Sequence, residues 1–310
     1  MKSISVIIPV FNEKESLSEL YQQLKRELSV YNNYEIIFID DGSYDGSYEL
    51  IHSFAIKNNK IKIIQFYRNY GKSAALSEGF KYSSGEYVVT IDSDLQDDPA
   101  EIKNLVLKLE EGFDLVSGWK KNRKDPIGKK IPSKFFNFIT RAFTGVMIHD
   151  FNCGLKIYKK NVIKSIEVYG GRHRYLPALA GQKKFKVTEI IVNHRPRLYG
   201  ETKYGGARFF HGFFDLISIL FLSKYTQSPL YFFGKIGLFT FLAGLSIEGY
   251  VIYLKYFLNE PFAQHMALLM LGILILIIGI QFFSIGLVGE MIANANQRKE
   301  FRIKNFLNKN

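Results

Sequence analysis

The sequence is poor in cysteine and tryptophan, with Cys153 and Trp119 as the single copies among 310 residues. One cysteine excludes an internal disulfide, which fits a reducing compartment, and we interpret Cys153 as a small packing residue rather than a nucleophile. The six histidines show no spacing typical of a metal site. No Gly-x-Gly-x-x-Gly follows the first predicted strand, which disfavours a nicotinamide-dependent oxidoreductase.

The N-terminal sequence does not resemble a secretory signal. Its apolar run from Ile4 to Val10 is short, contains Pro9 and is followed by polar residues. We therefore expect the N-terminal part to stay in the cytoplasm. The net charge of +12 predicts anionic partners, such as nucleic acid, acidic lipids or phosphorylated substrates. The basic residues cluster in loops predicted to lie near a membrane, so we expect no nucleic-acid partner.

Short apolar runs alternate with helical patterns along residues 1–203. The runs that we predict as strands are Ile4 to Pro9, Tyr34 to Asp40, Ile61 to Gln65 and Tyr87 to Asp92. This alternation is typical of right-handed crossovers, so it predicts an α/β domain with a mostly parallel, Rossmann-like, doubly wound sheet. Ligands of such sheets bind at the carboxyl ends of the strands.

The last third of the sequence is apolar and aromatic. Met266 to Gly289 contains no charged residue, and Ile236 to Leu254 contains only Glu248. At a rise of about 1.5 Å per residue, both runs are long enough to cross a bilayer. We predict transmembrane helices at 229–258 and 265–292. The alternative for each is a buried core helix.

The segments around the two spans predict their orientation. The tail at 293–310 is basic, and the link near 259–265 contains no Lys or Arg. The positive-inside rule then places the catalytic domain and both termini in the cytoplasm, at the plasma (inner) membrane. The segment 204–228 mixes aromatic and charged residues, which predicts an amphipathic helix at the membrane interface or a surface helix packed on the domain.

Two features of the first span favour a homo-oligomer. Glu248 is costly inside a bilayer and suggests a partner in the other span or in a neighbouring subunit. Small residues allow close contact between helices. The glycines concerned are Gly234, Gly237, Gly244 and Gly249.

The segment from Asp92 to Gln96 predicts a metal site. Asp92 and Asp94 follow the fourth predicted strand, two residues apart, with Gln96 close by. Carboxylates placed in this way suit Mg²⁺ or Mn²⁺, which takes its remaining ligands from water and from substrate phosphates. Such an ion neutralises the charge on a departing diphosphate.

The ends of the first two strands are candidates for nucleotide binding. Asp40 and Asp41 end the second strand, where a carboxylate accepts hydrogen bonds from a nucleobase imide or a ribose hydroxyl. A turn or helix-capping role is the alternative. The exit of the first strand offers Pro9, Phe11 and Glu13 for packing against a base or ribose. Other candidates are Lys72, which could also simply start a helix, and Trp119, which suits either stacking on a sugar or core packing.

Four motifs together resemble family 2 glycosyltransferases with the GT-A fold. In order, they are Val6-Ile7-Ile8-Pro9-Val10-Phe11-Asn12-Glu13, Asp40-Asp41-Gly42-Ser43, Arg68-Asn69-Tyr70-Gly71-Lys72 and Asp92-Ser93-Asp94-Leu95-Gln96-Asp97-Asp98-Pro99. More narrowly, they are similar to the polyisoprenyl-phosphate glycosyltransferases, the group of dolichyl-phosphate mannosyltransferases and bactoprenol glucosyltransferases. Two C-terminal spans match the second branch. The resemblance covers nearly the whole chain.

This resemblance implies a nucleotide-diphosphate sugar donor, a divalent cation, inversion at the anomeric carbon and a polyprenyl-phosphate acceptor. It implies that Asp92, Ser93 and Asp94 contact the donor or its metal. It also implies a catalytic role for Asp150, which matches the family's acid ahead of a Cys/Ser-Gly pair. A phosphate monoester is largely dianionic near neutral pH, so Asp150 is either a base or an orienting group.

The resemblance also assigns basic residues to the two phosphate groups. Arg197 and Lys203 match an Arg-x-x-Gly-x-Ser-Lys loop that would close over the donor diphosphate, with Thr202 in the place of serine. A basic run lies before Asp150, where the family binds the acceptor phosphate. Our candidates for that contact are Lys120, Lys129 and Ser133.

Two other functions stay open. A processive polysaccharide synthase has the same fold, but its Gln-x-x-Arg-Trp motif is missing here, and two spans are few for a polymer channel. A non-catalytic membrane scaffold is the second, although the acidic and basic motif residues are intact. Glucose on a uridine carrier is the expected donor. Galactose, N-acetylated sugars, mannose and aminoarabinose derivatives remain open.

Overall fold

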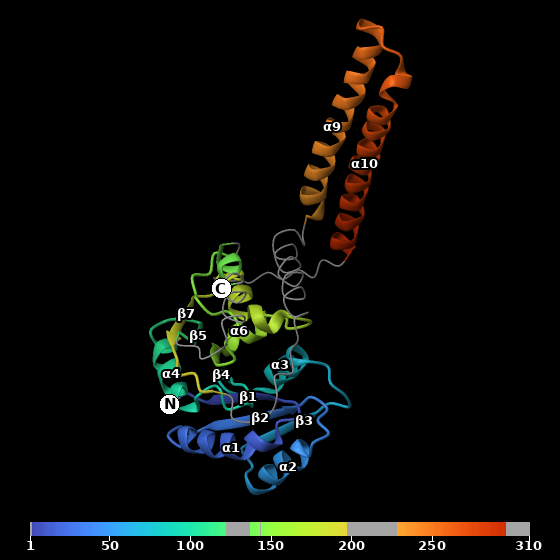
Figure 1. Ribbon diagram of the computed structural model, residues 1–310. Helices are drawn as coiled ribbons and strands as arrows, with labels where there is room; N and C mark the ends of the chain where they lie inside the picture. The colour runs from blue at the N-terminus through green and yellow to red at the C-terminus, as the bar shows by residue number, and fades with distance from the viewer. Residues whose placement is uncertain (1, 122–136, 143, 197–227, 296–310) are drawn as a thin grey trace, which may run out of the picture. The chain divides into compact units, whose positions relative to one another are not determined.

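The computed structural model describes residues 2–121, 137–142, 144–196 and 228–295 (Figure 1). The chain forms two compact units, Met1–Ile219 and Leu220–Asn310, which we call the first and second units.

The described part of the first unit contains a mixed, mostly parallel sheet in the order β3-β2-β1-β4-β6-β5-β7. The strands are β1 (Ile4–Val10), β2 (Tyr34–Asp40), β3 (Ile61–Gln65), β4 (Tyr87–Thr90), β5 (Leu115–Trp119), β6 (Lys156–Lys159) and β7 (Val187–Ile191). All neighbouring pairs are parallel except those of β6, which runs antiparallel to β4 and β5. The predicted α/β fold is confirmed.

Helices cover both faces of this sheet. They are α1 (Lys14–Leu28), α2 (Ser47–Lys57), α3 (Lys72–Tyr82), α4 (Ile102–Glu110), α6 (Lys160–Ser165) and α7 (Leu176–Gln182), with 3₁₀ turns η1 (Pro99–Glu101) and η2 (Arg172–Tyr175). Side chains of a strand point alternately to opposite faces. Val6 and Ile8 therefore join the core beneath α1, α2 and α4, whereas Ile7 joins the core beneath α3, α6 and α7. This is the doubly wound arrangement that the sequence pattern predicts.

Loops at the carboxyl ends of β1 and β2 are joined by hydrogen bonds. Asn12, which has a positive φ of 52°, accepts the Tyr44 N–H through its side chain at 3.0 Å. Its own N–H donates to the Ser43 hydroxyl at 3.0 Å, and the Lys14 N–H donates to Asp45 at 3.0 Å. These bonds order the edge where ligands of parallel sheets bind.

The antiparallel strand β6 adds a further segment to the same edge. Lys156, its first residue, pairs with Thr90 at the end of β4 and with Ser117 in β5. Because β6 runs the opposite way, the loop before it lies beside the ends of β4 and β5. The segment Asp150 to Gly154 therefore reaches the carboxylates that follow β4.

The second unit contains α9 (Pro229–Phe257), a 3₁₀ turn η3 (Phe262–His265) and α10 (Met266–Ala295). By length and composition, both helices could cross a membrane. They start and end within a few residues of the predicted spans, and nearly all of the segment predicted as amphipathic lies outside the described residues. A Cβ on Gly237 would lie 2.8 Å from the Gly279 carbonyl oxygen, so the two helix backbones pack closely here.

Candidate active site

The first group of the site is the carboxylate of Asp92, which follows β4. It forms an ion pair with the ammonium of Lys72, the first residue of α3. Burial alone would raise the pKa of Asp92, but Lys72, with help from Lys120 and Lys156, lowers it to about 2. Asp92 is therefore ionised at every physiological pH, and Lys72 is placed at the carboxylate by the start of its helix.

Asp94 has the opposite electrostatic environment. Burial, together with the nearby charges of Asp92 and Asp97, raises the pKa of Asp94 to about 6. Its Oδ1 accepts the Gln96 N–H at 3.2 Å, and Leu95 between them has a positive φ of 61°. The strained turn thus holds a carboxylate whose negative charge is poorly compensated.

Asp97 and Lys120 form a buried ion pair in the same region. The Lys120 Nζ lies 2.7 Å from Asp97 Oδ1, and the two side chains are 10% and 0% exposed. Although burial disfavours the ammonium, Asp97 holds the pKa of Lys120 above its ordinary value. The ammonium has three donors, so the predicted contact of Lys120 with an acceptor phosphate would use one that Asp97 does not occupy.

Gly154 lies where the carboxylates of Asp92 and Asp97 converge. A Cβ built on Gly154 would lie 2.5 Å from Asp92 Oδ2 and 2.7 Å from Asp97 Oδ2. The same Asp97 oxygen is buried and has no hydrogen-bond partner among the described residues. Only glycine leaves room for both carboxylates at this point.

These residues fit a divalent cation held with help from a ligand. No group of three or more His, Cys, Asp or Glu side chains in the described part of the chain is arranged to hold a metal. Burial, and after it the charges of Asp92 and Asp97, raise the pKa of Asp94, and a bound cation would stabilise its ionised form. Mg²⁺ and Mn²⁺ commonly use one or two carboxylates and complete their shells with phosphate and water. Asp92, Asp94 and Gln96 stay the predicted ligands.

Asp40, the last residue of β2, and Asp41, which follows it, have different contacts. Asp41 is 4% exposed and accepts the N–H groups of Tyr70 and Gly71 at 2.7 and 2.9 Å. Burial raises the pKa of Asp41 in spite of these hydrogen bonds. Asp40 is fully buried, accepts the Ser43 N–H at 3.1 Å, and has no partner for its Oδ2 among the described residues. Asp41 therefore orders the loop before α3, and Asp40 is the acid with an unused acceptor.

The other predicted nucleotide-binding residues lie near the same edge. Pro9 is in β1, and the ring of Phe11 meets the exposed Tyr44 edge-to-face at 6.2 Å. The Glu13 N–H donates to Ser47 at 3.1 Å. The carbonyl of the buried Ser93 accepts the Ser16 hydroxyl at 2.6 Å, which ties α1 to the loop after β4. Ser93 thus contributes a structural contact through its backbone.

The predicted catalytic acid Asp150 is 2% exposed and lies in the loop before β6. Its Oδ1 accepts the Asn152 N–H at 3.1 Å, and its carbonyl accepts the Ser117 hydroxyl at 3.3 Å. Glu189 of β7 accepts the Asp150 N–H at 3.3 Å. At the other end of the loop, the buried ammonium of Lys156 donates to the Cys153 carbonyl. The loop is thus held at both ends.

Trp119 and Cys153 have packing roles in the structure. The indole of Trp119 stacks on the imidazole of His149, with centroids 4.1 Å apart and planes at 11°. Cys153 is 1% exposed, and burial and the charge of Asp97 raise the pKa of its thiol to about 12. A thiol this basic is a poor nucleophile at neutral pH.

Some predicted site residues lie outside the described residues. They are Arg197 and Lys203 for the donor diphosphate, and Lys129 and Ser133 for the acceptor phosphate. Their roles stay predictions.

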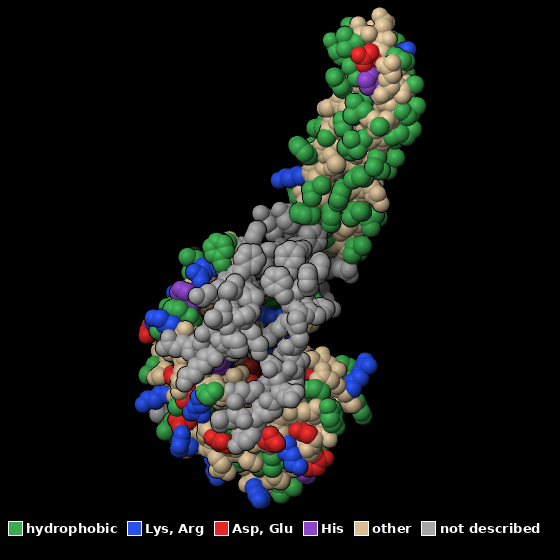
Figure 2. Space-filling view, in the orientation of Figure 1, with side chains coloured by type: hydrophobic (Ala, Val, Ile, Leu, Met, Phe, Trp, Pro, Cys, Tyr) green, Lys and Arg blue, Asp and Glu red, His purple; other side chains and the backbone are tan. Residues whose placement is uncertain are grey.

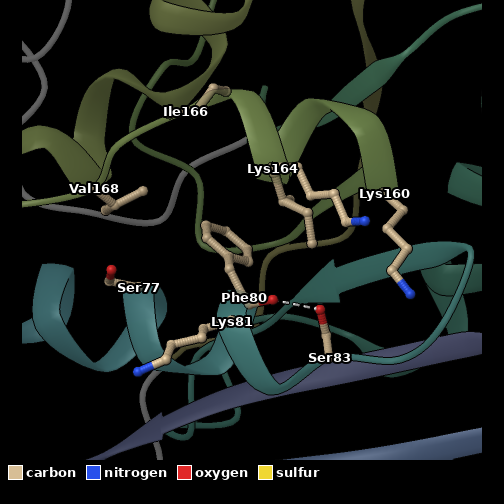
Figure 3. A pocket seen from close by; sticks show the side chains of 9 residues that line it. Ser77, Phe80, Lys81, Ser83, Lys160, Lys164, Ile166 and Val168 are labelled. Atoms are coloured by element: carbon tan, nitrogen blue, oxygen red, sulfur yellow. Dashed lines mark hydrogen bonds between the residues drawn. The ribbon is translucent and has the colours of Figure 1, made fainter. Parts of the chain in front are cut away.

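A pocket of about 410 Å³ lies between α3 and α6, away from this edge (Figure 3). Phe80 and Lys81 line it from the last turn of α3, whereas Lys72 begins that helix. The pocket's first lining residue on α3 is Ser77, and none of its lining residues is among those of the candidate site. The pocket is therefore not part of the candidate active site.

Comparison with known sequences decides the family. The family model "Glycosyl transferase family 2" matches residues 5–167, which include all but the first residue of β1, the strands β2 to β6 and the loops that carry the acids. The chain belongs to glycosyltransferase family 2. The resemblance drawn from the sequence motifs is confirmed.

Relatives of this glycosyltransferase cover almost its entire length. It is 34% identical over 303 residues to a dodecaprenyl-phosphate galacturonate synthase of Rhizobium johnstonii, covering 96% of this chain and 89% of that protein. It is 35% identical over 294 residues to an undecaprenyl-phosphate 4-deoxy-4-formamido-L-arabinose transferase of Salmonella choleraesuis, covering 94% and 88%.

Solved structures confirm the fold of the glycosyltransferase. The glucosyl-3-phosphoglycerate synthase of Mycobacterium tuberculosis, in a complex with Mn²⁺, uridine diphosphate and phosphoglyceric acid, aligns with a TM-score of 0.57 at 20% identity. The alignment covers 71% of this chain and 78% of that one. At this identity, the similarity concerns the fold alone.

The sequence reasoning missed several residues of the glycosyltransferase site. Lys156, Glu189 and His149 were not predicted, and Asp97 was noted only as part of a motif. Lys156 begins β6, whose sequence is Lys-Ile-Tyr-Lys, and nothing in that pattern distinguishes the buried Lys156 from the partly exposed Lys159. No local signal existed for Glu189, since its partners lie some forty positions away.

Proposed function

We propose that this chain transfers a sugar from a nucleotide-diphosphate sugar to a polyprenyl phosphate, with inversion and with the help of Mg²⁺ or Mn²⁺. The observation that carries the proposal is the carboxylate pair after β4. Asp92 is paired with Lys72, while the charge of Asp94 is left poorly compensated at the edge where ligands of such sheets bind. Both relatives described above are named for polyprenyl-phosphate substrates and match nearly the whole chain.

The donor half of the site follows from the strand ends. Asp92, Asp94 and Gln96 would hold the cation. The cation would neutralise negative charge on the departing diphosphate. Pro9, Phe11 and Glu13 would line the nucleoside site. Asp40 would accept a hydrogen bond from the base or ribose, and Asp41 would keep the loop before Lys72 in place. Arg197 and Lys203 would contact the diphosphate.

The acceptor half follows from the loop before β6. Asp150 is buried, and Glu189 and Lys156 hold the two ends of its loop. We infer that Asp150 orients the acceptor or the donor sugar. A phosphate monoester is largely dianionic near neutral pH and needs little activation as a nucleophile. Lys129 and Ser133 would complete the phosphate contact.

The sugar and the cellular location belong to the same proposal. The relatives act on galacturonate and 4-deoxy-4-formamido-L-arabinose, so these sugars join glucose as candidate donors. We propose the plasma (inner) membrane as the location, with α9 and α10 spanning it and the catalytic unit and both termini in the cytoplasm. The glycines Gly237 and Gly244, which suggested contact between subunits, pack against α10 of the same chain. A homo-oligomer therefore stays a prediction.

Incubation of the purified full-length protein with undecaprenyl phosphate tests the proposal. Radiolabelled UDP-glucose, UDP-galacturonate and UDP-4-deoxy-4-formamido-L-arabinose are offered separately, each with Mg²⁺, with Mn²⁺ or with EDTA. We expect one donor to give a labelled lipid that extracts into butanol, and EDTA to abolish it. Label in a water-soluble polymer would favour a processive synthase, and no labelled lipid with a broad donor panel would contradict the proposal.

A further inference from the structure

We propose that His149, oriented by Glu189 and backed by Trp119, binds the acceptor phosphate through its Nε2 and takes the proton that this phosphate still carries. This inference rests on the proposed function and adds to it a residue that contacts the acceptor.

Glu189 fixes the position of the imidazole. One of its carboxylate oxygens accepts the His149 N–H at 2.7 Å and the Asp150 N–H at 3.3 Å, and the other contacts His149 Nδ1. The Glu189 side chain is 11% exposed. A nearly buried carboxylate thus receives three donors from two successive residues, which orients both the ring and the loop that carries Asp150.

Trp119 covers one face of the same ring. It ends β5, which pairs with β7, and its indole lies parallel to the imidazole with centroids 4.1 Å apart. Nδ1 and one ring face of His149 are therefore occupied, yet the His149 side chain is 49% exposed. Because Nδ1 and one face are occupied, we infer that the exposed part includes the edge that carries Nε2.

The protonation chemistry of this edge suits a phosphate monoester. A carboxylate on Nδ1 makes that nitrogen the donor, so Nε2 accepts a proton or, in the imidazolium, donates one. A phosphate monoester has a second pKa of about 6, so near neutral pH a part of it still carries a proton that Nε2 can accept. Among the described residues, Glu189 from β7 contacts this ring, Asp150 is its neighbour in the chain, and the Nζ of Lys121 lies 5.4 Å from the centre of the Trp119 ring that stacks on it.

The place of His149 in the sheet favours the acceptor over the donor diphosphate. The proposed cation ligands follow β4, whereas His149 lies over β5 and β7, beyond β6 in the strand order. Neighbouring strands are about 4.8 Å apart, so two steps across the sheet give roughly 10 Å. That distance leaves room for a sugar ring between the donor diphosphate and the acceptor phosphate.

The proposed step conserves atoms and charge. The proton of the P–OH group passes to His149 Nε2. The freed phosphate oxygen forms a bond to the anomeric carbon while the bond from that carbon to the donor diphosphate breaks, and the electron pair leaves on the diphosphate. The imidazolium then returns its proton to water.

The single tryptophan makes the inference testable by binding alone. Trp119 is the only tryptophan of the chain and touches His149, so its fluorescence reports on this ring. Full-length protein in detergent micelles is titrated with undecaprenyl phosphate, with undecaprenol and with inorganic phosphate. We expect a saturable change with undecaprenyl phosphate, a weaker one with inorganic phosphate and none with undecaprenol. An equal response to undecaprenol would overturn the assignment to phosphate.

His149→Phe retains an aromatic ring against Trp119 and removes both ring nitrogens, the Nδ1 that contacts Glu189 and the Nε2 proposed to bind phosphate. We expect the Kd for undecaprenyl phosphate and the acceptor KM to rise about tenfold, the value of one charge-assisted hydrogen bond, with the donor KM unchanged. The pH profile of kcat/KM for the acceptor should lose one titration. Glu189→Gln should give a smaller rise. His52→Phe is the matched control, since His52 also contacts an aromatic ring, Tyr48, but lies exposed on α2.

The two proposals fail in different ways. If the wild type makes labelled lipid and His149→Phe has an unchanged acceptor KM and Kd, the inference about His149 is wrong while the transferase function stands. If the wild type binds undecaprenyl phosphate through His149 but transfers no sugar from any donor, the proposed function is wrong while the phosphate site stands. Retained Mn²⁺ and UDP binding shows that a variant is folded.

Discussion

The two units use the same apolar side chains in opposite ways. In the first unit, Val6, Ile7 and Ile8 are completely buried, whereas in the second Phe239 is 79% and Ile280 is 56% exposed. Figure 2 shows hydrophobic side chains over most of the visible surface of the helix pair, and charged side chains among the others on the first unit. Exposed apolar surface is unfavourable in water and favourable in the hydrocarbon core of a bilayer. The buried apolar side chains of the first unit therefore suit water, and the exposed ones of the second unit suit the hydrocarbon core of a bilayer.

Charged groups show the same difference. In the first unit, the buried Glu35 contacts Lys62 at 2.6 Å and accepts the Ser5 hydroxyl at 2.5 Å, which together overcome the effect of burial and lower its pKa to about 2. In the second unit, Glu248 packs against Gly272, and its Oε1 has no hydrogen-bond partner among the described residues. Polar chemistry is thus concentrated in the first unit.

Among the variants that would separate the roles of the two units, we expect the largest effect from Asp94→Asn. The variant keeps the shape of the side chain but loses the charge proposed to hold the cation, so sugar transfer should fall by at least roughly 1,000-fold. Membrane retention should be unchanged. Transfer is measured with undecaprenyl phosphate, and Glu78→Gln on the exposed side of α3 serves as the control. Full activity of Asp94→Asn would remove the metal site from the proposal.

The variant Ile280→Lys tests whether the helices of the second unit lie in a bilayer or in water. Ile280 is exposed near the middle of α10, so a lysine would be harmless in water but should cost about 3 kcal/mol in a bilayer. We expect reduced membrane insertion, measured by carbonate extraction. Ile56→Lys is the matched control, because Ile56 is 75% exposed on α2 of the first unit. Equal tolerance of the two lysines would contradict the comparison.

The close packing of the helix pair is tested by Gly237→Ala. Its new methyl group would meet the backbone of α10 at Gly279 and Phe283, at 2.8 and 3.0 Å, so the helices must separate. We expect a loss of about 1–3 kcal/mol in the free energy of unfolding, measured by thermal denaturation in detergent. Gly249→Ala has open space at the same atom and should be neutral or slightly stabilising. The same result for both would show that the helices do not pack in this way.

The site of the first unit is tested by Gly154→Ala. The methyl group would displace the carboxylates of Asp92 and Asp97, which lie within 2.7 Å of its position. We expect Mn²⁺ affinity to fall roughly 10- to 100-fold, as for other residues that orient metal ligands. Isothermal titration calorimetry measures it, and circular dichroism without metal checks the fold. Unchanged affinity would place the cation elsewhere.

The smallest effect concerns pH. The pKa of Asp94 is raised to about 6 in the folded protein, so without a cation its ionisation costs stability as pH rises through that value. A divalent cation binds the ionised carboxylate and competes with the proton. Its binding therefore becomes stronger, not weaker, as the pH rises. Mn²⁺ affinity should therefore fall about tenfold per pH unit below about 6 and level off above it. Titrations between pH 5 and 8 check this, and a flat profile would contradict the role of Asp94.

Much of the fold was predictable from the sequence because burial follows local patterns. The strands at Tyr34–Asp40 and Ile61–Gln65 have the predicted bounds. The prediction was wrong at the end of β4, which stops at Thr90, and Asp92 lies beyond the strand, where it pairs with Lys72. Proline near the start of a helix suits its first turn, and the segment from Pro99 begins as a 3₁₀ turn and continues as α4.

The sequence by itself determined which residue types stand at the strand ends and which helices suit lipid. Both follow from periodic burial and from run length, which are properties of neighbouring residues. The tertiary structure alone decided that Lys120 pairs with Asp97, that Lys156 anchors the loop of Asp150, and that Glu189 orients His149. These contacts depend on the order and direction of β4, β6, β5 and β7, and no local pattern encodes which distant strands become neighbours.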